Sequence, residues 1–210
     1  MQAIIFDMDG VIIDSERFWQ QAEQEVFSSL GVEVTEDLSE QTRTMTTAEV
    51  ALFWYEKYPW QSKELQQVEH RVVSRVIELI EKEDCAIEGV KDFIERHREK
   101  GFKIGLATNS PQRIIPVVLN KLGIAHLFDA VSSAEFEEKG KPDPAVYTTT
   151  AEKLNVKPAH CFAIEDSHTG MLAAKNAGMT VLAFTNAGQT DSPLASYRIT
   201  DFGTHTIEIR

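Results

Sequence analysis

The stretch Ala3-Ile4-Ile5-Phe6-Asp7-Met8-Asp9-Gly10, residues 3–10, decides the fold. Its run of apolar residues predicts a short buried strand, and the polar residues that follow mark the carboxyl end of that strand. Side chains alternate along a strand, so Asp7 and Asp9 point the same way at this end. Two carboxylates this close repel each other unless a cation or a shared proton lies between them. Hard oxygen ligands suit magnesium, and a simple polar turn closed by Gly10 is the alternative at this point.

Further apolar runs repeat the strand pattern along the second half of the chain. Together with the first, they span Ala3–Phe6, Lys103–Ala107, Phe128–Val131, Cys161–Ile164 and Thr180–Phe184. Apolar residues at helical spacing lie between the last four runs, over residues 110–122, 142–154 and 168–177. Strands that alternate with helices predict an α/β fold with a Rossmann-like, doubly wound parallel sheet. Ser110 is predicted to cap the first of these helices, which Pro111 opens.

Residues 15–84 break this alternation, because they carry successive helical patterns and no strand pattern. The clearest pattern runs over residues 63–83, where apolar residues recur at three- and four-residue steps amid charged neighbours. We expect an all-helical domain over residues 15–84, inserted into a core domain of residues 1–14 and 85–210. An insertion directly after the first strand can cover the carboxyl edge of the sheet, where ligands of open α/β folds bind.

The composition excludes several classes of function. The chain has 210 residues, and its 33 acidic and 21 basic residues give a net charge of −12. This charge would repel nucleic acid or an anionic membrane, because both partners need a basic face. No apolar run approaches the roughly 20 residues of a membrane span, and no signal-peptide pattern precedes the first strand, so we expect a cytoplasmic protein. Cys85 and Cys161 lack metal-type spacing and are expected to be buried thiols.

Three further segments bring polar residues to the same edge of the predicted sheet. Thr108–Pro111 follows the second strand and offers a hydroxyl, an amide and a helix amino terminus, which together suit a phosphate group. Lys141 lies in the proline-stiffened loop 139–144 and could offer phosphate a fixed charge, although a lone loop lysine is usually solvated. The pair Glu165-Asp166 closes another buried strand, where carboxylates are costly to bury and gain from a nearby cation.

In their order and spacing, these motifs resemble those of the haloacid dehalogenase superfamily of phosphohydrolases. That superfamily carries a D-x-D, a Thr or Ser closing the second strand, a Lys and an acidic pair, and the match extends from Asp7 to Gly170. The sequence is most similar to the β-phosphoglucomutase and 2-deoxyglucose-6-phosphatase branch, through F-D-M-D-G-V-I-I-D-S-E, G-K-P-D-P and I-E-D-S-x-x-G. The resemblance implies a magnesium-dependent phosphatase acting on a small phosphorylated metabolite, such as a hexose or deoxyhexose phosphate, with residues 15–84 as its helical cap.

The resemblance also implies a role for each matching position. Asp7 would be the nucleophile that forms an aspartyl-phosphate, and Asp9 would be the general acid and base. Magnesium would be held by Asp7, the backbone carbonyl of Asp9, and Asp166. Glu165 would be either a further ligand or a partner of one. The groups expected to hold the transferring phosphoryl group are Thr108, the Asn109 backbone and Lys141.

Two other functions stay open at this point. A β-phosphoglucomutase shares every core motif, but the mutases place a histidine in the first cap helix where this chain has Trp19. Trp19 is expected to offer an apolar face instead, and Arg43 is only a displaced counterpart of the arginine that mutases present to a distal phosphate. A non-catalytic sugar-phosphate sensor is the second alternative, although binding alone needs no nucleophile facing an acid. Asp9 argues against a dehalogenase, and a monomer is the default oligomeric state.

Several conspicuous residues are expected to have supporting roles. His168 lies inside the last motif at a variable position, so we expect it at the surface or behind the site. An aromatic cluster in the insertion could line a sugar-binding cleft or pack the core of the cap. Its members are Phe53, Trp54, Tyr55, Tyr58 and Trp60.

Overall fold

The computed structural model describes residues 1–43, 45–61, 63–185 and 192–203. The described strands form one parallel sheet in the order β3-β2-β1-β4-β5-β6. Their bounds are β1 Ala3–Phe6, β2 Lys103–Thr108, β3 Ala130–Ser133, β4 Cys161–Glu165, β5 Thr180–Phe184 and β6 Tyr197–Ile199. The prediction of an α/β fold with a doubly wound parallel sheet is confirmed.

The predicted strands match five of the observed ones to within two residues at each end, with β3 shifted along the chain and β6 missed. β3 spans Ala130–Ser133 rather than Phe128–Val131, because the Phe128 N–H still closes the preceding 3-10 turn on the Ala125 carbonyl. β6 was not predicted, since two of its three residues, Tyr197 and Arg198, are exposed and leave no apolar run to recognise.

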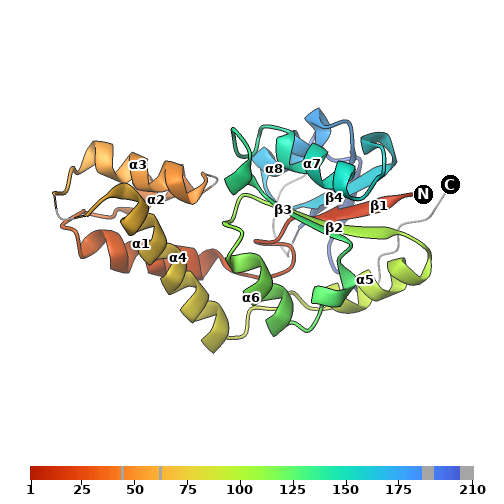
Figure 1. Ribbon diagram of the computed structural model, residues 1–210, viewed down its shortest axis with the longest axis horizontal. Coiled ribbons are helices and arrows are strands. Elements are labelled where there is room, and N and C mark those ends of the chain that lie inside the picture. Colours follow the sequence, from red (N-terminus) through yellow and green to blue (C-terminus); the bar gives the residue numbers. More distant parts are fainter. Residues whose placement is uncertain (44, 62, 186–191, 204–210) are drawn as a thin grey trace.

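Helices α5 and α6 cover one face of the sheet, and α7 and α8 cover the other (Figure 1). Their bounds are α5 Val90–Glu99, α6 Ile114–Lys121, α7 Ala145–Lys153 and α8 His168–Asn176, and short 3-10 helices lie at Ala125–Leu127, Ala134–Phe136 and Pro158–His160. Ile4 and Phe6 of β1 pack into the core cluster on the α5 face, whereas Ala3 and Ile5 join the cluster beneath α7. A strand buried on both faces explains the uninterrupted apolar run that opens the chain.

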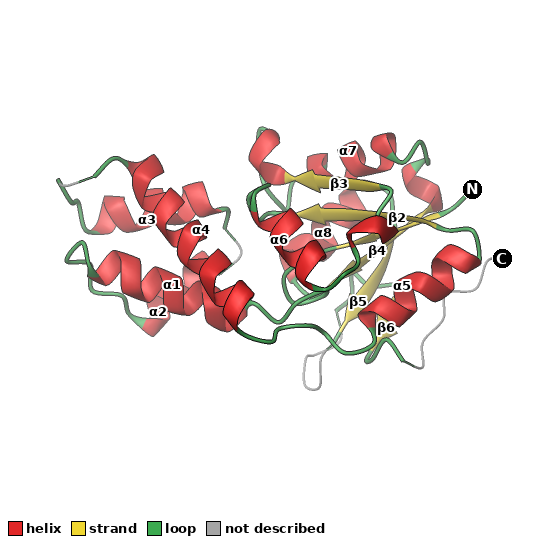
Figure 2. Ribbon diagram, turned by 60° about the horizontal axis from the view of Figure 1, so that its bottom comes forward, coloured by secondary structure: helices red, strands yellow, loops and turns green. Residues whose placement is uncertain are grey.

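The remaining helices gather at one end of the molecule, beyond the carboxyl ends of the strands (Figure 2). They are α1 Glu16–Ser28, α2 Glu36–Thr42, α3 Thr47–Lys57 and α4 Leu65–Lys82. The fully buried Trp54 ring packs 5.7 Å from that of Phe27, and none of the five clustered aromatic residues lines the cleft described below. The aromatic cluster therefore packs the core of the helical end. The predicted domain ranges stay a prediction, and they include residues 44, 62, 186–191 and 204–210, which lie outside the described part of the chain.

Two connectors, residues 7–15 between β1 and α1 and residues 83–89 between α4 and α5, join the helical end to the sheet, and their backbones pair with each other. Asp14 N–H donates to the Cys85 carbonyl at 2.8 Å, and Ile87 N–H donates to the Ile12 carbonyl at 3.0 Å. Arg17, at the start of α1, reaches the other connector through the Asp84 carbonyl at 3.0 Å. These backbone hydrogen bonds hold the two connectors side by side, so the helices are linked to the sheet through one paired segment.

The two cysteines, Cys85 and Cys161, are buried thiols without a disulfide, as predicted. None of the described helices is both long and apolar enough to span a membrane. The cytoplasmic location and the monomeric state stay predictions.

Candidate active site

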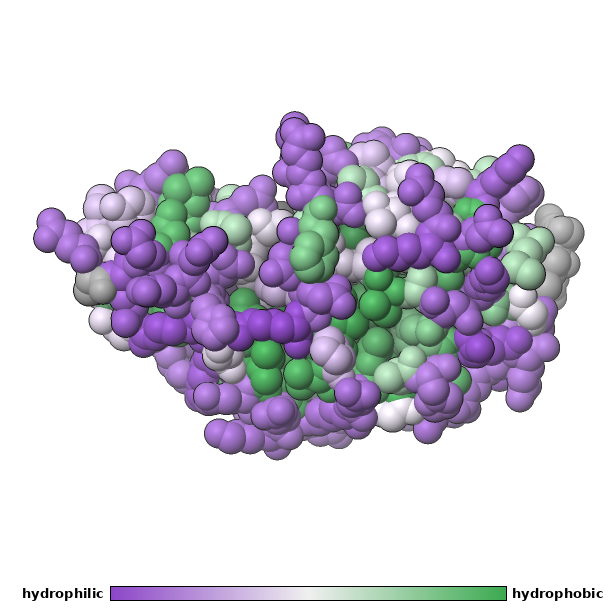
Figure 3. Space-filling view, viewed as in Figure 1, coloured by the Kyte–Doolittle hydropathy of each residue, from purple (hydrophilic) through white to green (hydrophobic). Residues whose placement is uncertain are grey.

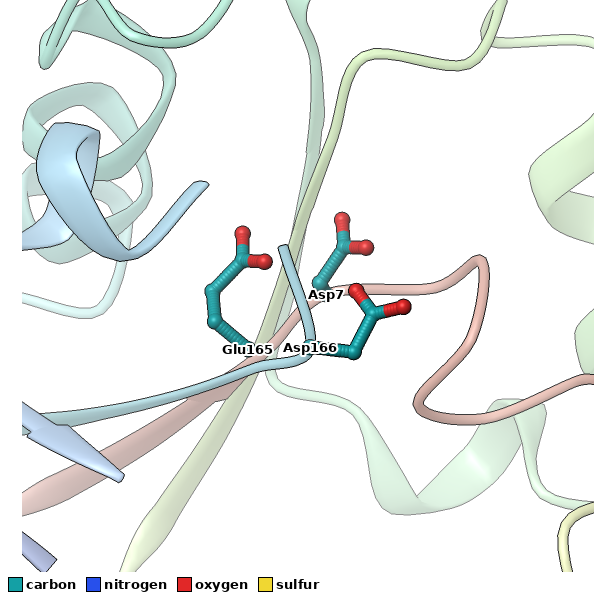
Figure 4. Close-up of side chains that lie close together, drawn as sticks. All are labelled: Asp7, Glu165 and Asp166. Carbon is teal, nitrogen blue, oxygen red and sulfur yellow. The ribbon is translucent and has the colours of Figure 1, made fainter. Parts of the chain in front are cut away.

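The acidic ends of two neighbouring strands, β1 and β4, form the centre of the site. Asp7 N–H donates to the Ile164 carbonyl at 3.0 Å, which holds Asp7 beside the end of β4. Carboxylate oxygens of Asp7, Glu165 and Asp166 lie within 4.8 Å of one another (Figure 4). The chain continues from β1 to β2 on one side and reaches β4 on the other, so this is the switch point at which open α/β sheets bind ligands.

Lys141 is buried between these carboxylates instead of lying in solvent. Its Nζ donates to Asp7 Oδ1 at 2.6 Å, to Glu165 Oε1 at 2.6 Å and to the Ala107 carbonyl at 2.9 Å. Burial by itself would lower the pKa of Lys141, but the charges of Asp7 and Glu165 raise that pKa above its ordinary value. Lys141 is therefore a fixed positive charge beside Asp7.

Glu165 is fully buried and holds Lys141 in place. Besides Lys141, its Oε1 accepts a hydrogen bond of 2.6 Å from the Tyr147 hydroxyl, and its Oε2 accepts one of 3.2 Å from Ser167 Oγ. A Cβ added at Gly170, on the first turn of α8, would lie 2.0 Å from Glu165 Oε1. A residue larger than glycine would therefore displace this carboxylate.

The carboxyl groups of Asp7 and Asp166 are destabilised in their charged forms. Burial raises the pKa of Asp7 well above its ordinary value, against the opposing charge of Lys141. Burial also raises the pKa of Asp166 to about 7, and the neighbouring Glu165 adds to that rise. Gly10 allows this crowding, because it has φ +77° and an added Cβ would lie 2.0 Å from Asp166 Oδ2.

Asp9 is held by donors from both sides of the cleft. Its Oδ1 accepts from Ser15 Oγ at 2.5 Å and from the Trp19 indole N–H at 3.0 Å, both at the start of the helical end. Its Oδ2 accepts from Ser110 Oγ at 2.6 Å and, at the outer limit of 3.5 Å, from Thr108 Oγ1. Asp9 thereby links the sheet to the helices that cover it.

The expectation that Ser110 caps a helix is wrong. Helix α6 begins at Ile114 with Arg113 at its N-cap, and the Ser110 hydroxyl is used by Asp9. Thr108 Oγ1 accepts from the Ser110 N–H at 3.0 Å, which tightens the turn after β2. The carboxylate of Asp9 needs a nearby donor, and this outweighs the local preference of serine for a cap.

A cleft of ≈ 1060 Å³ lies between the strand ends and helices α1, α2 and α3. The predicted residues Asp7, Asp9, Thr108, Asn109, Lys141 and Asp166 all line it. Glu165 lies behind the cleft wall, and His168 is exposed at the rim. The structure thus gathers the proposed catalytic and phosphate-binding residues at one surface.

The profile of haloacid dehalogenase-like hydrolases matches residues 1–178. The chain belongs to this hydrolase family. It is 40% identical to hexitol phosphatase B of Escherichia coli strain K12 over 179 residues, which cover 84% of this chain and 80% of that protein. It is 33% identical to β-phosphoglucomutase of Bacillus subtilis strain 168 over 186 residues, which cover 85% and 81%. A crystal structure of β-phosphoglucomutase from Clostridium difficile matches with a TM-score of 0.85 at 25% identity, over 96% of this chain and 92% of the other.

The donor set of this haloacid dehalogenase-like hydrolase fits a hard divalent cation. Carboxylate oxygens are the ligands that magnesium prefers, and a cation would offset the cost of ionising Asp7 and Asp166 in a buried site. Glu165 already accepts hydrogen bonds from three side chains, so it fits the role of a partner that orients Lys141 better than that of a ligand.

Three contacts at the site of the hydrolase were not predicted from the sequence. Tyr147 was treated as part of a helical pattern, yet its hydroxyl binds Glu165. Trp19 was expected to offer only an apolar face, yet its indole N–H binds Asp9. Ser15 was given no role, although the D-S-E segment that contains it was quoted in the resemblance, yet its hydroxyl binds Asp9. The contact of Tyr147 with Glu165 joins two elements that meet only in the fold. The contacts of Ser15 and Trp19 with Asp9 depend on the turn that brings the start of α1 back beside Asp9.

Proposed function

We propose that this hydrolase is a magnesium-dependent phosphatase that removes the phosphoryl group from a small phosphorylated sugar. The observation that carries the proposal is the buried contact between Asp7 and Lys141, 2.6 Å long, opposite an Asp9 held by donors from both sides of the cleft. A nucleophile, a fixed cation and an acid at one surface are what phosphoryl transfer needs.

The chain's own residues would carry out the reaction in two steps. An Asp7 oxygen forms a bond to phosphorus while the bond from phosphorus to the sugar oxygen breaks, and Asp9 gives its proton to that departing oxygen. Water then enters, Asp9 takes one of its protons, and the water oxygen attacks phosphorus to release inorganic phosphate and regenerate Asp7. Asp9 therefore ends the cycle protonated, as it began.

The remaining polar groups would hold the transferring group. Lys141, fixed by Glu165, lies where it can offset negative charge beside Asp7, and the Thr108 hydroxyl and Asn109 N–H would bind phosphoryl oxygens. Magnesium held by Asp7, Asp166 and the Asp9 carbonyl would neutralise charge on these oxygens.

Two contacts favour hydrolysis over isomerisation. The indole N–H of Trp19 can donate to Asp9 but cannot take up or release a proton at neutral pH, unlike the histidine expected of a mutase. Arg43 is paired with the carboxylates of Glu16 and Glu40. Its charge is therefore partly neutralised and attracts a second phosphate less strongly. A mutase has to hold a sugar bisphosphate while it reorients, and the cap offers little for that task.

The test supplies β-glucose 1-phosphate, a glucose bisphosphate primer and magnesium. Inorganic phosphate and glucose 6-phosphate are measured in parallel. We expect phosphate to form faster than glucose 6-phosphate. Accumulation of glucose 6-phosphate with little phosphate would show that the protein is a mutase and not a phosphatase. Absence of both products across a panel of sugar phosphates would favour the non-catalytic sensor.

A further inference from the structure

The wall of the cleft formed by the helical end carries many polar side chains, mostly uncharged or acidic, beside the apolar Trp19, Met45 and Val50. Its lining residues include Gln20, Glu23, Gln24, Ser39, Thr42 and Thr47. On the face seen in Figure 3, hydrophilic residues also predominate over the helical end, at the left of the view. A wall rich in hydroxyl, amide and carboxyl groups matches a ligand rich in hydroxyl groups, since each such group can pair with one on the ligand.

Positive charge is scarce on this wall. Among the described lining residues of α1 to α3 and their connections, Arg43 is the cation, and it is paired with Glu16 and, at 3.6 Å, with Glu40. Glu36 lines the same wall. A second phosphate on the substrate would meet several carboxylates here, so like-charge repulsion disfavours it.

Glu23 holds a particular place on this wall. It lies four residues after Trp19 on α1, so the two share a face of the helix about 6 Å apart along its axis. Trp19 reaches Asp9, and Glu23 is therefore one turn farther from the reacting centre. That position suits contact with the end of a sugar remote from its phosphate.

In the described part of the chain, the half-buried carboxyl group of Glu23 has Thr42 as its side-chain hydrogen-bond partner. Burial raises its pKa to about 7, and the interaction with Thr42 opposes that rise. Thr42 has a single O–H, and its hydroxyl also donates to the Ser39 carbonyl at 2.9 Å. Thr42 therefore divides its single O–H between Glu23 and Ser39. A partly desolvated carboxylate is stabilised by a further hydrogen-bond donor, and a substrate hydroxyl can supply one.

We propose that Glu23, together with Thr42, binds a hydroxyl group at the substrate end remote from the phosphate, and so selects monophosphates whose remote end carries uncharged hydroxyl groups. This inference rests on the proposed phosphatase function and names the class of its substrate. Glu23 is a specificity-determining residue in it, and it takes no part in the transfer of the phosphoryl group.

The first test compares substrates with and without distal hydroxyls. Phosphate release is measured for glucitol 6-phosphate and for p-nitrophenyl phosphate with the wild type, Glu23→Gln, Glu23→Leu and the control Glu33→Gln. Glu33 is exposed and does not line the cleft, so Glu33→Gln makes the same chemical change as Glu23→Gln elsewhere. We expect Glu23→Leu to lower the ratio of kcat/KM for glucitol 6-phosphate to that for p-nitrophenyl phosphate by about tenfold or more, mainly through KM.

The control and the binding measurement separate the two proposals. Glu33→Gln should leave this ratio within about twofold of the wild type. Binding of glucitol 6-phosphate and of inorganic phosphate is measured by calorimetry in an Asp7→Asn background. There Glu23→Leu should weaken glucitol 6-phosphate binding about tenfold more than phosphate binding. If Glu23→Leu weakens the binding of both ligands equally, or of neither, the role of Glu23 is refuted. If binding changes as expected while the wild type releases no phosphate, the phosphatase proposal fails and the role of Glu23 stands.

Discussion

The hydrogen bond from Trp19 to Asp9 gives the sharpest single-residue prediction. Trp19→Phe keeps an aromatic ring on α1 and removes the N–H that donates to Asp9 Oδ1 at 3.0 Å. Asp9 becomes negatively charged as it gives its proton to the departing sugar oxygen, and a hydrogen bond to a charged acceptor contributes about 1.5–3 kcal/mol. Asp9 retains donors from Ser15 and Ser110, so we expect the lower end of this range, about 1.5 kcal/mol. That corresponds to a loss of about tenfold in kcat/KM for a sugar phosphate.

Trp60→Phe is the matched control for this substitution. The Trp60 indole N–H also makes one hydrogen bond, of 3.0 Å to the Lys63 carbonyl, but Trp60 lies outside the cleft. Phosphate release is assayed for both variants at equal concentrations of folded protein, checked by thermal melting. We expect Trp60→Phe to stay within about twofold of the wild type in kcat/KM. Equal activity losses in the two variants, or an unchanged kcat/KM in Trp19→Phe, would refute the positioning role of Trp19.

Three further results are expected. Tyr147→Phe removes the hydroxyl that donates to the buried Glu165, and should lower the free energy of unfolding, measured in urea, by about 1–3 kcal/mol; no loss would mean that the contact is dispensable. The pKa of Glu23 is raised from 4.5 to about 7 on folding, so Glu23 stabilises the fold at low pH and this contribution is lost as pH rises through 7. The melting temperature of Glu23→Gln relative to the wild type should therefore rise between pH 5 and pH 8, and a constant difference would contradict the burial of this carboxyl. Magnesium with a mimic of the phosphoryl transition state should slow hydrogen exchange across the helical insertion, residues 15–84, and unchanged exchange with the mimic bound would rule out closure over the site.

The sheet and the residues at its edge could be predicted because both leave local signals. A strand buried on both faces needs an apolar run, and the polar residues that follow it, such as Asp7 and Glu165, mark its carboxyl end. Parallel strands then bring those ends together, which is why residues 158 positions apart in the chain, from Asp7 to Glu165, could be assigned to one site.

The contacts that tune the site could not be predicted, because they depend on how distant segments pack. The burial of Lys141 follows from two carboxylates that surround it in the fold, and a loop sequence carries no sign of that. Glu23 looks like a solvated residue on an amphipathic helix until α2 brings Thr42 beside it. Ser110 fits a helix cap by local preference, and only the position of Asp9 explains why it serves otherwise.

The most direct test of the proposed reaction is phosphate release by Asp7→Asn, measured beside the wild type and the exposed control Asp92→Asn, with magnesium and with a chelator. The wild type and Asp92→Asn should release phosphate from a sugar phosphate only with magnesium. Asp7→Asn, shown to be folded by its thermal melt, should lose at least about a thousandfold in kcat, because it lacks the nucleophile. Turnover by Asp7→Asn near the wild-type rate would contradict the covalent route through Asp7.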